Sequence, residues 1–194
     1  FVICIFAISA SAAEKVGDFY YSFDDANLTA RLTIDNVNFN REDGIADIKS
    51  TVEYKGKTYT VVALNDGCFS GSTSNSWSGN KSIKEVYIPE TVTYIGKHAF
   101  RECINLKKAI VKGNITSFYD AEFYHCYALE ELDMSAVTSL TKIGDYFCQG
   151  DSKLTTIKIP STVTSIGGNA FAQCSSLTSF DFVPSGVTSI GGRA

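Results

Sequence analysis

Histidines, cysteines and paired carboxylates are the side chains of this sequence that could do chemistry. Its two histidines are His98 and His125. His98 precedes Phe100 by two residues, whereas His125 follows Phe123 by two, so the imidazoles do not occupy equivalent places. A general base or a metal-ligand pair needs groups that converge on one point. We therefore interpret both as surface or turn histidines rather than as a catalytic or ligand pair.

The cysteines that follow Cys4 are Cys68, Cys103, Cys126, Cys148 and Cys174. Cys103, Cys126 and Cys174 share one position of the repeat described below, and the other two do not. Equivalent residues of neighbouring coils stack about 5 Å apart, which permits a disulfide. The position also suits a small buried thiol. We expect buried free thiols, with a Cys103–Cys126 bridge as the alternative, and the lack of a C-x-x-C pair argues against zinc.

Paired carboxylates occur at Asp24-Asp25 and at Glu42-Asp43, in polar stretches without the spacing or the glycine of an EF-hand. We interpret them as solvated turns. No G-x-S-x-G, P-loop or H-E-x-x-H motif is present in the sequence. We expect no enzyme activity, no cofactor and no metal. Three N-x-S/T acceptors matter only in a eukaryotic secretory route, which we do not favour: Asn27, Asn80 and Asn114.

The charge pattern bears on the class of partner. The net charge is −4, from 17 Lys and Arg against 21 Asp and Glu, and the basic residues are scattered. Nucleic acids and anionic membranes select clustered positive charge. We therefore expect neither as a partner.

A repeat of about 24 residues organises the chain from Val92 to its end. Its copies are VTYIGKHAFRECINLKKAIV, ITSFYDAEFYHCYALEELDM, LTKIGDYFCQGDSKLTTIKI, VTSIGGNAFAQCSSLTSFDF and VTSIGGRA. An earlier copy begins at Val61 as VVALNDGCF. The aligned apolar columns are Ile95, Phe118, Ile143, Ile166 and Ile190; Phe100, Phe123 and Phe171; and Leu106, Leu129, Leu154 and Leu177.

Such self-similarity predicts a solenoid, in which each copy buries its apolar face against its neighbours. After the leucine column each copy alternates apolar with polar residues, as in Ile157-Lys158-Ile159, which predicts a short strand. About eight extra residues after Phe69 predict a rim loop. Trp77 in that loop either packs on the coil or forms an exposed contact. Cys148 fills a Phe column, so we expect a local shift that lets Phe147 fill the pocket.

The stretches IPETVTYIGKHAFRECINL and IPSTVTSIGGNAFAQCSSL resemble the BspA-type (treponemal-type) leucine-rich repeat. The resemblance covers about Val61 to Ala194, and departures are confined to Lys112 and Ser135, where Pro is usual, and to Cys148. It implies a right-handed, curved solenoid with a parallel strand ladder on the concave side. Short strands at V-T-x-I and helical turns at A-F-x-x-C are implied on the convex side. Members of that family are typically exported or surface proteins that act in adhesion and protein binding.

The ends of the sequence suggest three parts. Residues 1–13 include Ala10-Ser11-Ala12 after an apolar run and are typical of the tail of a secretory signal peptide, with a clipped membrane helix as the alternative. Residues 14–60 do not fit the repeat, and we expect a small antiparallel β cap that merges with the first coil. Residues 61–194 form the repeats, and the last copy stops before its strand. We therefore expect a longer natural protein, with no membrane span in the mature visible part.

The predicted function follows from the concave ladder. Its outward residues are expected to be Glu85, Tyr87, Lys108, Ile110, Glu131, Asp133, Thr156, Lys158, Ser179 and Asp181. Aromatic anchors with a polar rim suit a protein partner. Our hypothesis is a secreted or cell-surface monomer that binds a host extracellular-matrix protein or another cell-surface protein. The alternative is a structural spacer that presents another domain and binds nothing.

Overall fold

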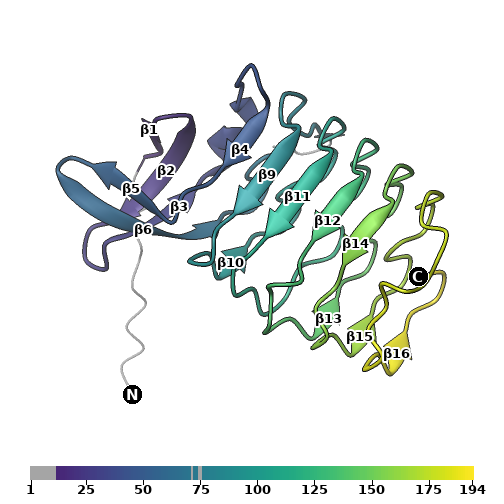
Figure 1. Ribbon diagram of the computed structural model, residues 1–194. Helices are drawn as coiled ribbons and strands as arrows, with labels where there is room; N and C mark the ends of the chain where they lie inside the picture. The colour runs from purple at the N-terminus through teal and green to yellow at the C-terminus, as the bar shows by residue number, and fades with distance from the viewer. Residues whose placement is uncertain (1–11, 71, 74–75) are drawn as a thin grey trace.

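The computed structural model describes residues 12–70, 72–73 and 76–194, and its regular structure is almost entirely strand. Figure 1 shows a row of coils that run side by side, with strands along two sides of the row. The predicted leader falls mainly on residues 1–11, outside the described residues. In the described part of the chain, no helix is long and apolar enough to cross a membrane.

One side of the row is a five-stranded parallel sheet, which we call the long ladder. Each strand is three or four residues long and pairs with its equivalent in the next coil. Inward side chains such as Val86 and Leu132 are fully buried, and the residues on either side of them in each strand are partly exposed. This alternation is expected of a half-buried strand. The strands, in sheet order, are β14 (Thr156–Lys158), β12 (Glu131–Asp133), β11 (Lys108–Val111), β9 (Glu85–Ile88) and β4 (Ile45–Asp47).

The other side carries shorter two-residue strands from the V-T-x-I segments. β10 (Tyr94–Ile95) pairs in parallel with Ala63 and Leu64, which occupy the equivalent positions of the preceding copy. A separate parallel sheet joins β13 (Lys142–Ile143), β15 (Ser165–Ile166) and β16 (Ser189–Ile190). Between these two sheets lies the segment Ser117–Phe118, which forms no strand.

The A-F-x-x-C segments form turns rather than the helical turns that the resemblance implied. In the described residues the only helix is the 3-10 helix η1 (Ile34–Asn38), which lies outside the repeats. Each complete turn carries two residues with positive φ, four positions apart, and a helix requires negative φ throughout. The pairs are His98 and Glu102, Ala121 and His125, Tyr146 and Gly150, and Asn169 and Gln173.

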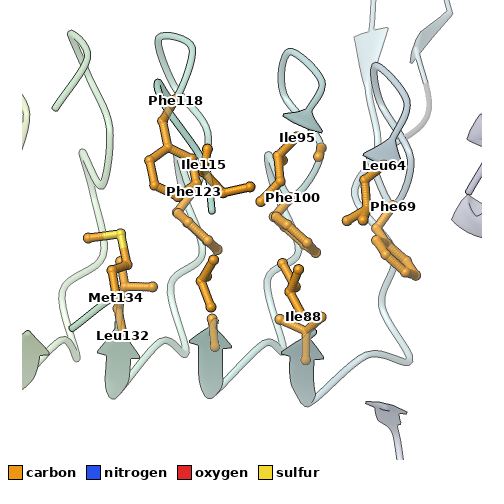
Figure 2. Packing of buried hydrophobic residues seen from close by; sticks show 14 of the residues in the cluster. Leu64, Phe69, Ile88, Ile95, Phe100, Ile115, Phe118, Phe123, Leu132 and Met134 are labelled. Atoms are coloured by element: carbon orange, nitrogen blue, oxygen red, sulfur yellow. The ribbon is translucent and has the colours of Figure 1, made fainter. Parts of the chain in front are cut away.

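The phenylalanine column forms the centre of the core. The rings of Phe69, Phe100 and Phe123 stack, with centroids 5.5 and 5.2 Å apart and planes within 15° and 3° of parallel. Figure 2 shows these rings in line between the turns above and the ladder below. Burying each such side chain contributes roughly 1.5–3 kcal/mol. The predicted apolar spine is therefore continuous through these coils.

Phe147 enters the core without the local shift that we expected from Cys148. The Phe123 amide donates to the Phe147 carbonyl (2.9 Å) and the Cys148 amide to the Ala170 carbonyl (2.7 Å), which are the repeat's regular bonds. The backbone register is thus intact. Phe147 occupies the position of Ala99 and Ala170 in other copies, and its side chain is fully buried. Its ring meets that of Phe123 edge-on, with centroids 5.5 Å apart and an angle of 80° between the planes. The Phe147 ring is therefore rotated relative to the stack, while the backbone keeps the register of the repeat.

The N-terminal part merges with the first coil and is only partly antiparallel. In this sheet β1 pairs antiparallel with β2, β2 with β3, and β5 with β6, whereas β6 pairs in parallel with both β3 and β10. The short insertion holds β7 (Ser72–Thr73) and β8 (Ser76–Trp77), an antiparallel pair; the Trp77 side chain lies outside the described part. The strands of the N-terminal sheet are β1 (Glu14–Val16), β2 (Phe19–Asp24), β3 (Thr29–Leu32), β5 (Thr51–Tyr54) and β6 (Lys57–Leu64).

Candidate binding face

The outward side chains of the long ladder form two rows across the sheet. The strand register places Lys108 between Glu85 and Glu131 in one row, and Ile110 between Tyr87 and Asp133 in the other. The rows end at β14 with Thr156 and Lys158, as the strand pairing of β12 and β14 requires. Eight of the ten predicted face residues are therefore brought together: Glu85, Tyr87, Lys108, Ile110, Glu131, Asp133, Thr156 and Lys158.

Ser179 and Asp181 do not lie on a ladder strand, although they line one depression together with Thr156 of β14. Residues 177–180 form no strand, and Phe180 is 82% exposed instead of pointing inward. Among the described residues, β14 is the last strand of the ladder, so this segment has no ladder strand on its other side. The alternation of Ser179, Phe180, Asp181 and Phe182 was therefore not sufficient to predict a strand.

Sequence reasoning missed the first strand of the ladder. β4 lies in the segment assigned to the cap, yet it pairs in parallel with β9 and sets Asp47 beside Tyr87. The only signal in the sequence was the short run of apolar and polar residues from Ile45 to Ile48. Such a short run cannot distinguish a ladder strand from a strand of a hairpin. The face thus begins one strand earlier than predicted.

The charges on the face are paired with one another. Lys108 Nζ lies 2.8 Å from Glu131 Oε2, and Lys158 Nζ lies 2.7 Å from Asp133 Oδ2. The Tyr87 hydroxyl donates to Glu85 Oε2 at 2.6 Å. Burial opposes ionisation of Asp133, but hydrogen bonds from Lys158 and Ser135 outweigh it and lower its pKa. Solvent screens these surface pairs, so they contribute little to stability, and their main effect is a face without a dominant charge.

Tyr87 and Ile110 are the apolar members of the face and lie side by side on β9 and β11. They border an open depression of about 240 Å³ at the ladder's carboxyl edge. Small-molecule pockets usually hold 300–1,000 Å³, so this one suits a side chain of a macromolecule better than a cofactor. Its remaining lining is Asp47, Ile48, Lys49, Ser50, Ile88, Pro89, Glu90 and Lys112.

The five cysteines among the described residues are buried free thiols, so Cys103 and Cys126 do not form the alternative bridge. Cys103 Sγ donates to the Phe69 carbonyl (3.6 Å) and Cys126 Sγ to the Phe100 carbonyl (3.1 Å), so each thiol bonds to the preceding coil. Burial raises the pKa of the Cys103 thiol to about 12. Such thiols are poor nucleophiles, because the thiolate is the reactive form.

The histidines do not form a site. His98 and His125 occupy the two different left-handed positions of their turns, and burial lowers the pKa of both imidazoles. The His125 ring packs against Tyr124 and Tyr127, with centroids 3.7 and 5.0 Å away. Within the described ranges, no group of three or more His, Cys, Asp or Glu side chains is placed to hold a metal ion.

Asn80 has a structural role that sequence reasoning missed. Its Nδ2 donates to the carbonyls of Val37 (2.6 Å) and Phe39 (2.7 Å), and its Oδ1 accepts the amides of Ser82 and Ile83, both at 2.8 Å. The side chain is buried, with all its principal bonding groups used. Its N-x-S/T context pointed to a glycan acceptor, but in the folded chain Asn80 ties the N-terminal part to the first coil.

A stack of coils with one parallel ladder and an outward strand face defines the solenoid class of repeat proteins. The family model of the BspA type leucine rich repeat region matches residues 71–194, in six copies. That match covers more than half of the sequence, and the chain belongs to this family. No match to a curated protein was found.

Solved structures of bacterial proteins share the fold. A leucine rich cell surface protein from Faecalibacterium prausnitzii A2-165 is 20% identical, with a TM-score of 0.60 over 94% of this chain and 51% of that one. The T. pallidum Leucine Rich Repeat protein is 19% identical, with a TM-score of 0.58 over 92% and 85% of the two chains. The chain thus spans about half the length of the Faecalibacterium protein. At these identities the likeness establishes the fold alone.

Proposed function

We propose that this chain is a protein-binding module of an exported or cell-surface protein and that the long ladder is its binding face. The observation that carries the proposal is the apolar pair Tyr87 and Ile110 beside a depression, within rows of mutually paired charges. Protein interfaces concentrate their binding energy in such aromatic anchors, and a polar rim excludes water around them. The partner class is a host extracellular-matrix protein or another cell-surface protein.

The pairing of charges favours a protein partner over a highly charged polymer. Lys108 and Lys158 are both engaged by carboxylates, so the ladder offers no stripe of free cations to a phosphate backbone or an anionic membrane. Export is supported by the signal-peptide-like residues 1–13 and by the family's usual location, and it remains part of the proposal.

The test compares the wild type with a Tyr87→Ala/Ile110→Asp variant for binding to immobilised matrix proteins. We expect at least a tenfold loss of affinity, because truncating a central anchor typically costs about 2 kcal/mol or more. A Lys142→Asp variant is the matched control, since Lys142 is exposed on β13, away from the ladder. Equal binding by all three proteins would remove the ladder from consideration.

A non-binding spacer within a longer protein is the second candidate. It is motivated by the share of the Faecalibacterium protein that the chain covers, which is 51%. The spacer hypothesis predicts no saturable binding to any matrix or surface protein by the wild type itself. Saturable binding that the ladder variant loses would exclude it.

A further inference from the structure

Two acidic side chains lie inside the apolar core of the repeats. Glu122 and Asp151 are each 0% exposed. Glu122 occupies the column filled by Ala99 and Ala170 in other copies. Asp151 occupies the column filled elsewhere by the thiols Cys103, Cys126 and Cys174. Both columns otherwise hold small or apolar side chains, so the repeat does not require a charged group at either position.

The contacts of these carboxyls leave oxygen atoms without partners. Glu122 Oε1 accepts the Ala99 amide at 2.9 Å, whereas its Oε2 is buried and makes no hydrogen bond within the described residues. Neither side-chain oxygen of Asp151 makes a well-formed hydrogen bond there. The Cys126 amide and the Cys148 thiol are the polar groups that act on Asp151.

Among the described residues, neither carboxyl forms an ion pair with a Lys, Arg or His side chain. The titratable groups that interact electrostatically with Glu122 are Asp66 and the thiols of Cys68, Cys103 and Cys126. Those that interact with Asp151 are the thiols of Cys126, Cys148 and Cys174 and the Tyr127 phenol. An ionised carboxylate here would be a buried charge without compensation, which proteins avoid by keeping the group neutral.

We propose that Glu122 and Asp151 are held as neutral carboxylic acids in the core, and that they make the middle coils of the solenoid sensitive to pH, stable in acid and loosened in alkali. The affected coils are those that carry β12 and β14, which hold Glu131, Asp133 and Lys158 of the ladder's ion pairs, and Glu131 pairs with Lys108 on the neighbouring β11. Alkaline conditions would therefore disturb the core that supports the C-terminal half of the ladder.

The direction follows from linkage. Burial raises the pKa of both carboxyls well above their ordinary values. The stability that these two carboxyls contribute is therefore fully present below the unfolded carboxyl pKa of about 4. It is lost as the pH rises toward their raised pKa values in the folded chain. His98 and His125 act in the opposite sense, because a lowered folded pKa removes stability as pH falls below about 6.5. Variants that keep both histidines cancel that contribution.

The test measures Tm by circular dichroism from pH 5 to pH 9 for the wild type and for Glu122→Ala/Asp151→Cys, which installs the residues that other copies carry. We expect the Tm of the wild type to fall by roughly 5 °C or more relative to the variant over this range. Glu122→Gln/Asp151→Asn keeps the shape of both side chains and removes their ionisation. Its Tm should be lower overall but should show the same reduced dependence on pH.

An infrared spectrum supplies a readout that stability alone does not. The folded wild type at neutral pH should show the carbonyl band of a protonated carboxylic acid, and both double variants should lack it. Absence of that band in the folded wild type would overturn the proposal. So would parallel pH profiles of Tm in the wild type and in either double variant that folds.

Discussion

At the scale of single residues, the repeat is held by polar groups that bond from one coil to the next. The Asp145 amide is accepted by Asp120 Oδ1 at 2.9 Å, and the Gly168 amide by Asp145 Oδ1 at 2.8 Å. The thiols of Cys103 and Cys126 bond to carbonyls of the preceding coil in the same way. Sequence predicted the burial of the cysteines from their shared column. It did not predict the donor role, because the partner carbonyl belongs to a residue that only the folded stack brings near.

Asn80 gives a test at this scale. Asn80→Ala removes four hydrogen bonds and leaves the Val37 and Phe39 carbonyls without their donor. We expect the free energy of unfolding in urea to fall by about 2–4 kcal/mol, given about 1–3 kcal/mol for each buried group left unsatisfied. Asn105→Ala is the control, since its exposed side chain makes one bond, to the Lys81 carbonyl. A loss no greater than that of the control would refute the assigned role of Asn80.

At the scale of elements, the aligned columns predicted most of the ladder and failed at its two ends. β9, β11, β12 and β14 follow from the alternation after the leucine column. β4 was missed because its pairing with β9 joins segments about 40 residues apart, and a three-residue pattern carries no information about such pairing. The turns were mistaken for helical turns because the positive φ values of non-glycine residues such as His98 leave no mark in the sequence.

The phenylalanine stack tests the elements' packing. Phe123→Ala removes the ring that stacks on Phe100 and meets Phe147 edge-on. We expect a loss of about 3–5 kcal/mol in the free energy of unfolding, the usual cost of deleting a buried phenyl ring. Phe180→Ala is the matched control, because the Phe180 side chain is 82% exposed and should change stability by less than about 0.5 kcal/mol. Similar losses in the two variants would contradict the continuous spine.

At the scale of the whole molecule, coil stacking determines which side chains can act together. The residues of the candidate face come from five segments spread between Ile45 and Lys158, and only the register of the ladder makes them neighbours. The repeat period in the sequence predicted four of these five segments, those of β9, β11, β12 and β14, and missed β4. The buried acids Glu122 and Asp151 were not singled out, because a single carboxyl in an aligned column looks like an ordinary polar substitution until its burial is known.

The register of the ladder is the claim on which both proposals depend, and disulfide trapping tests it most directly. Glu131 and Thr156 are partners on neighbouring strands, whereas Glu131 and Lys158 are diagonal. Partners lie about 5 Å apart and diagonal neighbours about 7–8 Å, which exceeds the usual span of a disulfide. Under mild oxidation, Glu131→Cys/Thr156→Cys should therefore cross-link nearly completely and Glu131→Cys/Lys158→Cys poorly. Equal cross-linking of both pairs, or preferential cross-linking of the diagonal pair, would contradict the account.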